Sequence, residues 1–189
     1  MKRLAVYCGS NMGSGPTFAE RARVLGERMA AREVDLVYGG GHRGLMGVVA
    51  DAVLAGGGRA YGAIPQALVD LEVAHKGLTE LHVVGTMHER KAKMTDLADA
   101  FLAIPGGIGT LDELFEAWSW YSLGYHRKPF ALLNEDGFWD DLLAFLDTAT
   151  ASGFVSEERR RLLLVARTPD EAIDMLIAAS TGDKSQMVW

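Results

Sequence analysis

Short apolar runs alternate along the chain with longer segments in which apolar residues recur every three or four positions. The short runs are typical of buried β-strands, and the longer segments are typical of amphipathic helices. Residues 66–77 fit a loop or an irregular helix. Six strands are predicted, at residues 3–8, 34–38, 59–64, 79–84, 100–104 and 129–133. Helices are predicted at residues 17–32, 44–55 and 86–97, after the turns at residues 105–110 and 134–137, and after residues 156 and 168.

The alternation of strands and helices predicts an α/β fold, with a doubly wound, mainly parallel sheet and helices on both faces. No linker or change of composition divides the chain, so residues 1–180 are expected to form one domain, followed by a C-terminal tail at residues 181–189. Ligands of such folds bind at the carboxyl ends of the strands. The turns that follow the strands are therefore the first candidates for function.

The most informative turn is PGGIGT, at residues 105–110, between a predicted strand and a helix. Glycines let the backbone approach an anion, and the free N–H groups and dipole of a helix start attract it. Phosphate binding is one interpretation, and a tight connection without a ligand is the other. A second glycine turn, centred on Gly40, favours phosphate binding because both turns would face one cleft. Neither turn matches the P-loop or the dinucleotide fingerprint.

An acidic cluster of Asp112, Glu113 and Glu116 follows the glycine turn. A carboxylate beside a phosphate site can take part in catalysis. Glu113 also has a structural interpretation, because Thr110 and Glu113 have the spacing of the capping box S/T-x-x-E. The local sequence leaves both interpretations open.

Basic residues ahead of the glycine turn could bind the same anion. Arg90 and Lys91 precede the strand that leads into the turn, and they either reach the cleft or belong to a solvated helix face. Ser10 follows the first predicted strand and could also contact a ligand. No second histidine has ligand spacing to His88, so no metal site is expected.

Composition narrows the choice of partner. The chain has 189 residues, a net charge of −6 and a pI near 5.4, which argues against nucleic acid or an anionic membrane as the main partner. A small anionic molecule in a locally positive pocket is compatible with this charge. Cys8 is the only cysteine, so neither an intrachain disulfide nor a cysteine-based metal cluster is expected. The first apolar run is too short for a signal peptide and no run has membrane-spanning length, so a cytoplasmic location is expected.

Several motifs together resemble one family. MHERKAKM at residues 87–94, followed by PGGIGTLDE at residues 105–113, resembles the paired signature of the Lonely Guy (LOG) family of cytokinin riboside 5′-monophosphate phosphoribohydrolases, which are often labelled lysine decarboxylases. YGGGHRGLMG at residues 38–47 and AVYCGS at residues 5–10 are also similar to that family, as is LGYHRKPFALLN at residues 123–134. The resemblance extends to about residue 178.

The resemblance implies a Rossmann-like fold, a homodimer, and no metal or organic cofactor. It also implies hydrolysis of the N-glycosidic bond of an N6-modified adenosine 5′-monophosphate, which gives the free base and ribose 5-phosphate. By position, Arg90 and Glu113 match the catalytic pair of the family. The positions that match its nucleotide-contacting stretch are Lys91, Gly106, Gly107, Ile108, Gly109, Thr110 and Asp112.

Other positions in the matching motifs are expected at the same site. Glu72 falls at the spacing of a further substrate-contacting glutamate, in a stretch that matches the family less well. Ser119 stands where plant members often carry threonine. Ile108 replaces a tyrosine and Asp112 a glutamate that are common in plant members. The remaining expected contacts are Ser10, Gly40 and Met87.

Two alternatives to a phosphoribohydrolase are considered. A nucleotide carrier or sensor could use this fold without chemistry, but it would have no need for the pair of Arg90 and Glu113. A lysine decarboxylase would need a lysine that forms a Schiff base with pyridoxal phosphate, for which Lys91 and Lys93 could be nominated.

Overall fold

The computed structural model describes residues 1–71 and 73–181. Seven strands form one sheet in the order β4-β3-β2-β1-β5-β6-β7, and every neighbouring pair is parallel. Because all the pairs are parallel, the carboxyl ends of these strands lie on the same side of the sheet. The strands are β1 (Arg3–Tyr7), β2 (Asp35–Tyr38), β3 (Ala60–Pro65), β4 (Glu80–Val84), β5 (Ala100–Ala103), β6 (Phe130–Leu133) and β7 (Leu163–Ala166).

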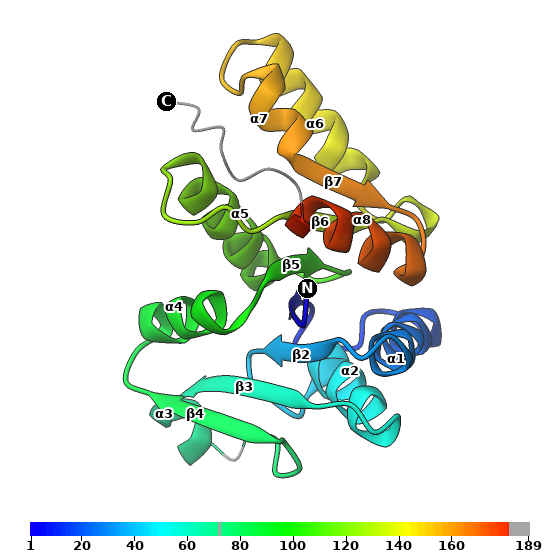
Figure 1. Cartoon of the computed structure of the whole chain (residues 1–189), viewed down its shortest axis with the longest axis vertical. Helices are drawn as coiled ribbons and strands as arrows, with labels where there is room; N and C mark the ends of the chain where they lie inside the picture. The colour runs from blue at the N-terminus through cyan, green and yellow to red at the C-terminus, as the bar shows by residue number, and fades with distance from the viewer. Residues whose placement is uncertain (72, 182–189) are drawn as a thin grey trace.

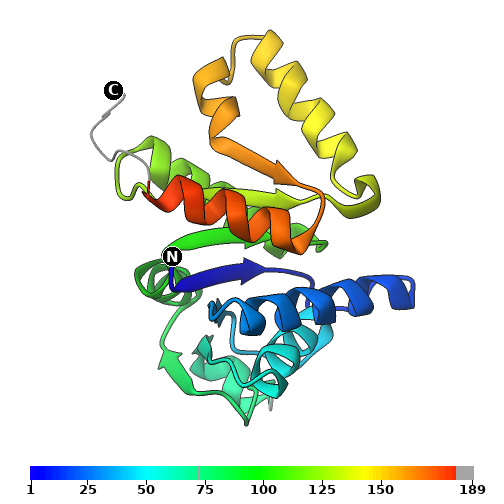
Figure 2. The same ribbon diagram turned by 45° about the vertical axis from the view of Figure 1, so that its right-hand side comes forward.

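Helices cover both faces of the sheet, which confirms the predicted doubly wound α/β fold (Figures 1 and 2). One face packs against α1 (Pro16–Ala31), α2 (Gly44–Ala55) and α8 (Pro169–Thr181). The other packs against α4 (Met87–Leu97), α5 (Ile108–Ser122) and α6 (Asp140–Ala151). The short helices are α3 (Gln66–Asp70), the 3₁₀ turn η1 (Glu135–Gly137) and α7 (Glu157–Leu162).

The central strand β1 shows why the strands read as continuous apolar runs. Leu4 and Val6 belong to the core under α1, α2 and α8, whereas Ala5 and Tyr7 belong to the core under α4, α5 and α6. Successive side chains of a strand point to opposite faces, so a strand covered on both faces must be apolar at every position. This burial fixes the strand ends, and with them the turns that carry the site.

The seventh strand was not predicted. Leu163–Ala166 continues without a break from α7, so its apolar residues extend the pattern of the helix before it. Its pairing with β6, for example Ala131 with Leu164, is a long-range contact that the local pattern does not encode. Residues 66–77 contain the short helix α3, in agreement with the irregular helix that was one of the two expectations.

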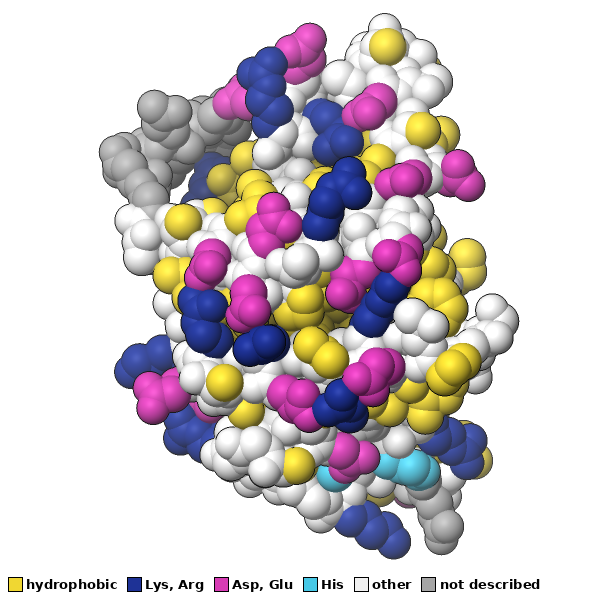
Figure 3. Space-filling model, turned by 90° about the vertical axis from the view of Figure 1, so that its right-hand side faces the viewer, with side chains coloured by type: hydrophobic (Ala, Val, Ile, Leu, Met, Phe, Trp, Pro, Cys, Tyr) yellow, Lys and Arg dark blue, Asp and Glu magenta, His cyan; other side chains and the backbone are white. Residues whose placement is uncertain are grey.

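The first residue of the tail predicted at residues 181–189, Thr181, is the last residue of α8, and residues 182–189 lie outside the described residues. Acidic and basic side chains are interspersed on the face shown in Figure 3, without one continuous patch of a single charge. Arg32, the C-cap of α1, pairs with Asp170 and Asp174 of α8. None of the helices in the described part of the chain has the length and apolar character needed to cross a bilayer.

Candidate active site

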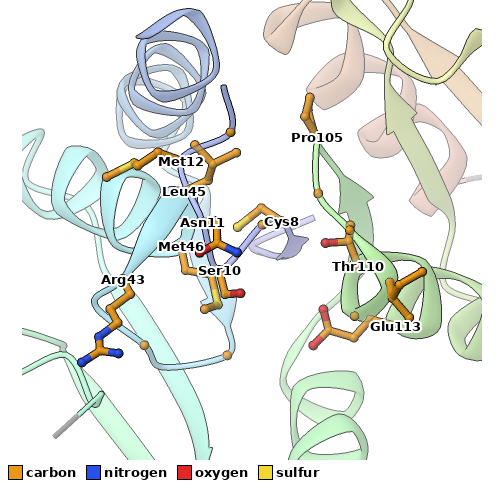
Figure 4. Close-up of a pocket in the computed structure, with 18 of the residues that line it drawn as sticks. Cys8, Ser10, Asn11, Met12, Arg43, Leu45, Met46, Pro105, Thr110 and Glu113 are labelled. Carbon is orange, nitrogen blue, oxygen red and sulfur yellow. The ribbon is translucent and has the colours of Figure 1, made fainter. Parts of the chain in front are cut away.

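A cavity of about 710 Å³ lies at the carboxyl ends of β1, β2, β3 and β5 (Figure 4). Each of these strands delivers residues to its wall at or beyond the carboxyl end, so four segments far apart in sequence meet here. The described lining consists of Cys8–Gly13, Phe18, Gly39, Gly41, Arg43, Leu45, Met46, Ile64, Leu68, Val73, Arg90, Pro105–Thr110, Glu113 and Phe138.

The glycine turn after β5 forms one wall and begins α5. Gly107 is the N-cap of this helix, and no side chain caps it. A β-carbon at Gly106 would lie 2.1 Å from Thr110 Oγ1 and 2.8 Å from the Gly9 nitrogen, so only glycine fits where these two turns meet. The first N–H groups of α5 therefore face the cavity without a side-chain partner, which is the arrangement that binds an anion.

The capping box that the spacing of Thr110 and Glu113 allows, one of the two interpretations of Glu113, does not form. Thr110 is the third residue of α5, and the Leu111 N–H donates to the Gly107 carbonyl at 3.1 Å. Glu113 consequently lies a turn further along the helix, where its side chain is 11% exposed. Figure 4 shows its carboxylate directed from α5 toward Ser10 and Met46, across the cavity. The structural interpretation of Glu113 is therefore wrong, and its carboxylate is available to the cavity.

Arg90 of α4 lines the cavity and is only 9% exposed. Its Nε donates to the Ala63 carbonyl at 3.2 Å, and its Nη2 lies 3.4 Å from Glu113 Oε1. A β-carbon at Gly39 would lie 1.8 Å from the same Nη2. The second glycine turn thus leaves the space that the guanidinium occupies, and Ala63 fixes its orientation.

The environment of Glu113 brings its titration close to neutral pH. Burial is the main cause and raises the pKa of its carboxyl, Arg90 and Lys91 lower it, and Asp112 and Glu116 raise it, with a net pKa of about 7. A carboxyl with this pKa exchanges protons readily at neutral pH, as a general acid or base must.

Lys91, the residue after Arg90, is turned toward α5. Its Nζ lies 3.1 Å from Asp112 Oδ2 and 3.0 Å from Glu116 Oε1. Lys91 is absent from the described lining of the cavity, as are Asp112 and Ser119. Met87 contacts the arginine, with its sulfur 3.9 Å from Arg90 Nη1.

The second glycine turn is held by the segment after α3. Gly41 forms an isolated bridge with Ala74, and the Val73 carbonyl accepts the His42 N–H at 2.9 Å. Gly40 itself does not line the cavity, but its neighbours Gly39 and Gly41 do. Glu72, predicted to contact substrate, lies outside the described residues.

The structure brings together eight of the predicted site residues in the cavity lining: Ser10, Arg90, Gly106, Gly107, Ile108, Gly109, Thr110 and Glu113. Sequence reasoning missed others. Asn11 and Met12 extend the turn after β1, and Arg43 and Met46 follow the second glycine turn. The sequence signals that could have found them are the place of Asn11 and Met12 in the turn after the first strand and the place of Arg43 and Met46 in the motif at residues 38–47.

None of the residues in the described lining is a lysine. The lysine decarboxylase alternative requires a lysine amine that can reach a cofactor in the cavity, and Lys91 is instead paired with two carboxylates. The geometry gives that alternative no support.

Comparison with known proteins decides the family. A family profile described as "Possible lysine decarboxylase" matches residues 46–176. A protein of Oryza sativa subsp. japonica named cytokinin riboside 5′-monophosphate phosphoribohydrolase LOG is 47% identical over 188 residues, which cover all of this chain and 78% of that protein. The chain belongs to the LOG family. A second LOG protein, from Arabidopsis thaliana and of the same enzyme name, is 46% identical over 93% of this chain and 81% of its own.

Solved structures support the fold of this LOG family member. The molybdenum cofactor binding protein of Rippkaea orientalis superposes with a TM-score of 0.72 over 95% of this chain and 97% of its own, at 22% identity. The molybdenum cofactor carrier protein of Chlamydomonas reinhardtii gives a TM-score of 0.71 over 95% and 98%, at 18% identity. At these identities the likeness concerns the fold alone.

Proposed function

We propose that this protein hydrolyses the N-glycosidic bond of N6-modified adenosine 5′-monophosphates, the cytokinin riboside 5′-monophosphates, and releases the base and ribose 5-phosphate. The observation that carries the proposal is the buried Arg90–Glu113 pair beside an uncapped helix start, in one cavity of a LOG family chain. The parts of the site correspond to the parts of such a nucleotide.

The phosphate is assigned to the glycine turn. The N–H groups at the start of α5 and the helix dipole favour a doubly charged anion, and Gly106 and Gly107 let it approach the backbone. Ser10 lies in the opposite wall, on the turn that Gly9 joins to Pro105 by a backbone hydrogen bond of 3.1 Å. Binding at the phosphate fixes the position of the sugar, and this positioning lowers the entropic part of the barrier.

The reacting bond is assigned to the neighbourhood of Glu113. Cleavage of a ribose–adenine bond passes through an oxocarbenium-like state, which a nearby carboxylate stabilises. Ionised Glu113 can also accept a proton from the attacking water. The water oxygen then bonds to the anomeric carbon, the bond to the base nitrogen breaks with its electron pair, and the departing base takes up a proton.

Arg90 is assigned to orientation and charge. Its guanidinium stays protonated at every relevant pH, so it is not a general acid. Fixed by Ala63 and paired with Glu113, it can hold the carboxylate and a ribose or phosphate oxygen in one geometry. The remaining predicted contacts, including Glu72, Asp112 and Ser119, stay predictions.

The test is chromatography of AMP and N6-isopentenyladenosine monophosphate after incubation with the wild type, with Glu113→Gln and with Glu158→Gln. Glu158 is an exposed glutamate of α7 that does not line the cavity, so its variant controls for loss of a carboxylate. We expect base and ribose 5-phosphate from the wild type and the control. Glu113→Gln should be slower by roughly a thousandfold, because an amide neither carries the charge nor accepts the proton.

Binding of a nucleotide without cleavage by the wild type would instead favour the carrier or sensor. Normal turnover by Glu113→Gln would remove the proposed role of this residue while leaving the activity in place. The ratio of the two wild-type rates ranks the substrates.

We also propose that the protein acts as a homodimer, as its resemblance to the family implies. Ile108 at the start of α5 is 83% exposed and Met87 at the start of α4 is 48% exposed, so apolar side chains beside the site are open to a partner. Sedimentation equilibrium tests this, and a single species of 20.5 kDa at all concentrations would contradict it. A cytoplasmic location stays a prediction from the sequence.

A further inference from the structure

Two consecutive residues of α4 pair with three acidic residues of α5, but only the first of them faces the cavity. Arg90 meets Glu113, whereas Lys91 meets Asp112 and Glu116. We propose that Lys91 is a positioning residue, which ties α5 to α4 and holds the Glu113 carboxyl against Arg90, and that it does not contact the substrate. The inference rests on the proposed function and assigns the role of Lys91 in that reaction.

The helical geometry explains why one lysine can act on Glu113 without touching it. Asp112 and Glu116 are four residues apart, so they lie on one side of α5, and Glu113 is the next residue round the helix. Lys91 Nζ lies 3.1 and 3.0 Å from their carboxylates and bridges them. A rotation of α5 that moved Glu113 away from Arg90 would also stretch these two contacts.

Lys91 is poorly placed to bind a phosphate. Its side chain is 11% exposed, and the Glu116 side chain that it meets is 21% exposed. Breaking a partly buried ion pair leaves an uncompensated charge, which is costly. Although burial lowers the pKa of Lys91, the hydrogen bonds that its ammonium donates to Glu116 and Asp112 raise it, so the ammonium is fully charged in these pairs.

The charges around Glu113 give the proposal a measurable consequence. From α4 it faces Arg90 and Lys91, and from α5 it faces Asp112 and Glu116. At the end of β1 it faces Tyr7 and the next residue, Cys8, whose pKa values are raised, chiefly by burial, so that both stay neutral. Loss of Lys91 would leave the carboxylates of Asp112 and Glu116 uncompensated beside Glu113, and this negative charge would raise the pKa of Glu113. Loss of Glu116 would have the opposite effect.

The first experiment measures the hydrolysis of N6-isopentenyladenosine monophosphate against pH, for the wild type, Lys91→Met, Glu116→Gln and the double variant. We expect Lys91→Met to move the acidic limb of kcat upward by about half to one pH unit, with a change in KM of less than about threefold. Glu116→Gln should move the limb downward, and the double variant should return toward the wild type. Lys93→Met, on the same helix and outside the described lining, is the control and should not move the limb.

A rise in KM of tenfold or more for Lys91→Met, with the limb unmoved, would show that Lys91 contacts the substrate and would overturn the proposal. Lys91→Arg keeps the charge and should keep the limb in place. If Lys91→Met does not fold, Glu116→Gln still tests the sign of the effect.

The second experiment separates this inference from the proposed function. The ¹³C resonance of the Glu113 carboxyl is titrated in the ligand-free wild type and in Lys91→Met. An upward shift supports the positioning role even if the wild type cleaves neither nucleotide, in which case only the proposed function fails. An unchanged titration overturns the positioning role, whatever the activity.

Discussion

The guanidinium of Arg90 lies against the Cα of Gly39, so closely that a β-carbon on residue 39 would be 1.8 Å from Nη2. A side chain from α4 thus occupies the place that any residue other than glycine would fill at the end of β2. The absence of a side chain at Gly39 therefore makes room for the Arg90 guanidinium, and the Arg90–Glu113 pair depends on this space.

Gly39→Ala should displace Arg90 and separate it from Glu113. A clash at 1.8 Å with a buried, hydrogen-bonded guanidinium cannot be relieved by a small shift. We expect kcat/KM for N6-isopentenyladenosine monophosphate to fall at least about a hundredfold, because misplacement of a catalytic group by an ångström has effects of this size. Gly15→Ala is the matched control, since nothing lies within 4 Å of the added carbon there. Comparable activity of the two variants would contradict the steric argument.

The pH dependence of turnover should follow the Glu113 carboxyl. Burial raises its pKa to about 7, and the proposed mechanism uses the ionised form. We expect kcat/KM, which reports the ligand-free enzyme, to fall about tenfold per pH unit below pH 7 and to level off above it. Rates of base release between pH 5 and pH 9 measure this dependence. An acidic limb with its midpoint near pH 4.5, the ordinary pKa of a glutamate, would show that the site does not perturb the Glu113 carboxyl.

Glu113→Gln should stabilise the fold at alkaline pH. Because the folded-state pKa is raised from 4.5 to about 7, protonated Glu113 stabilises the fold fully below pH 4.5, and this contribution is lost as the pH rises to 7. Above that pH the wild type carries a buried charge at a cost of about 3 kcal/mol, which the amide avoids. Urea denaturation at pH 8 and pH 5 should show the variant more stable than the wild type at pH 8 and nearly equal to it at pH 5. Equal stability at both values would contradict the raised pKa.

Asn134→Ala should destabilise the turn after β6. The 2% exposed amide donates to Asp140 Oδ1 at 2.8 Å and accepts the Trp139 N–H at 2.8 Å. Its loss leaves a buried N–H without a partner, so the free energy of unfolding should fall by about 2 kcal/mol. Denaturant titration checks this, and a change below about 0.5 kcal/mol would show that water or another group replaces the amide.

A chain that ends at Thr181 should fold and remain active. It retains all seven strands and α8, whose Ile173 and Leu176 belong to the core. We expect a melting temperature within a few degrees of that of the full chain and an unchanged kcat. A clear loss of either would show that residues 182–189 belong to the functional unit and would revise the predicted boundary.

The sequence predicted the fold well, because strands buried on both faces leave unbroken apolar runs that local inspection finds. It failed at β7, where a four-residue strand follows directly on a helix and only pairing with β6 defines it. Six strands and the helices on both faces could be predicted from the sequence, whereas the edge strand β7 is defined only by its three-dimensional contacts.

The site was predictable in part for a similar reason. Arg90, Glu113 and the glycine turn belong to contiguous motifs, and the structure places them in one cavity. The capping box was a wrong inference because the helix starts at Ile108, before Thr110, and spacing alone does not fix the first residue of a helix. Lys91 was expected at the site from its place beside Arg90 and from its match to the family motif. Adjacent residues of a helix point about 100° apart, and the Lys91 side chain meets Asp112 and Glu116.

The uncapped start of α5 also bears on what limits the reaction. A phosphate held by the N–H groups of residues 108–110 has the same charge before and after the sugar–base bond breaks. The turn would therefore bind substrate and ribose 5-phosphate alike, which lowers KM without speeding the chemical step. Ribose 5-phosphate should therefore be a competitive inhibitor. Its release leaves the N–H groups at the start of α5 without a phosphate partner again, so product release is a candidate for the slow step of the cycle.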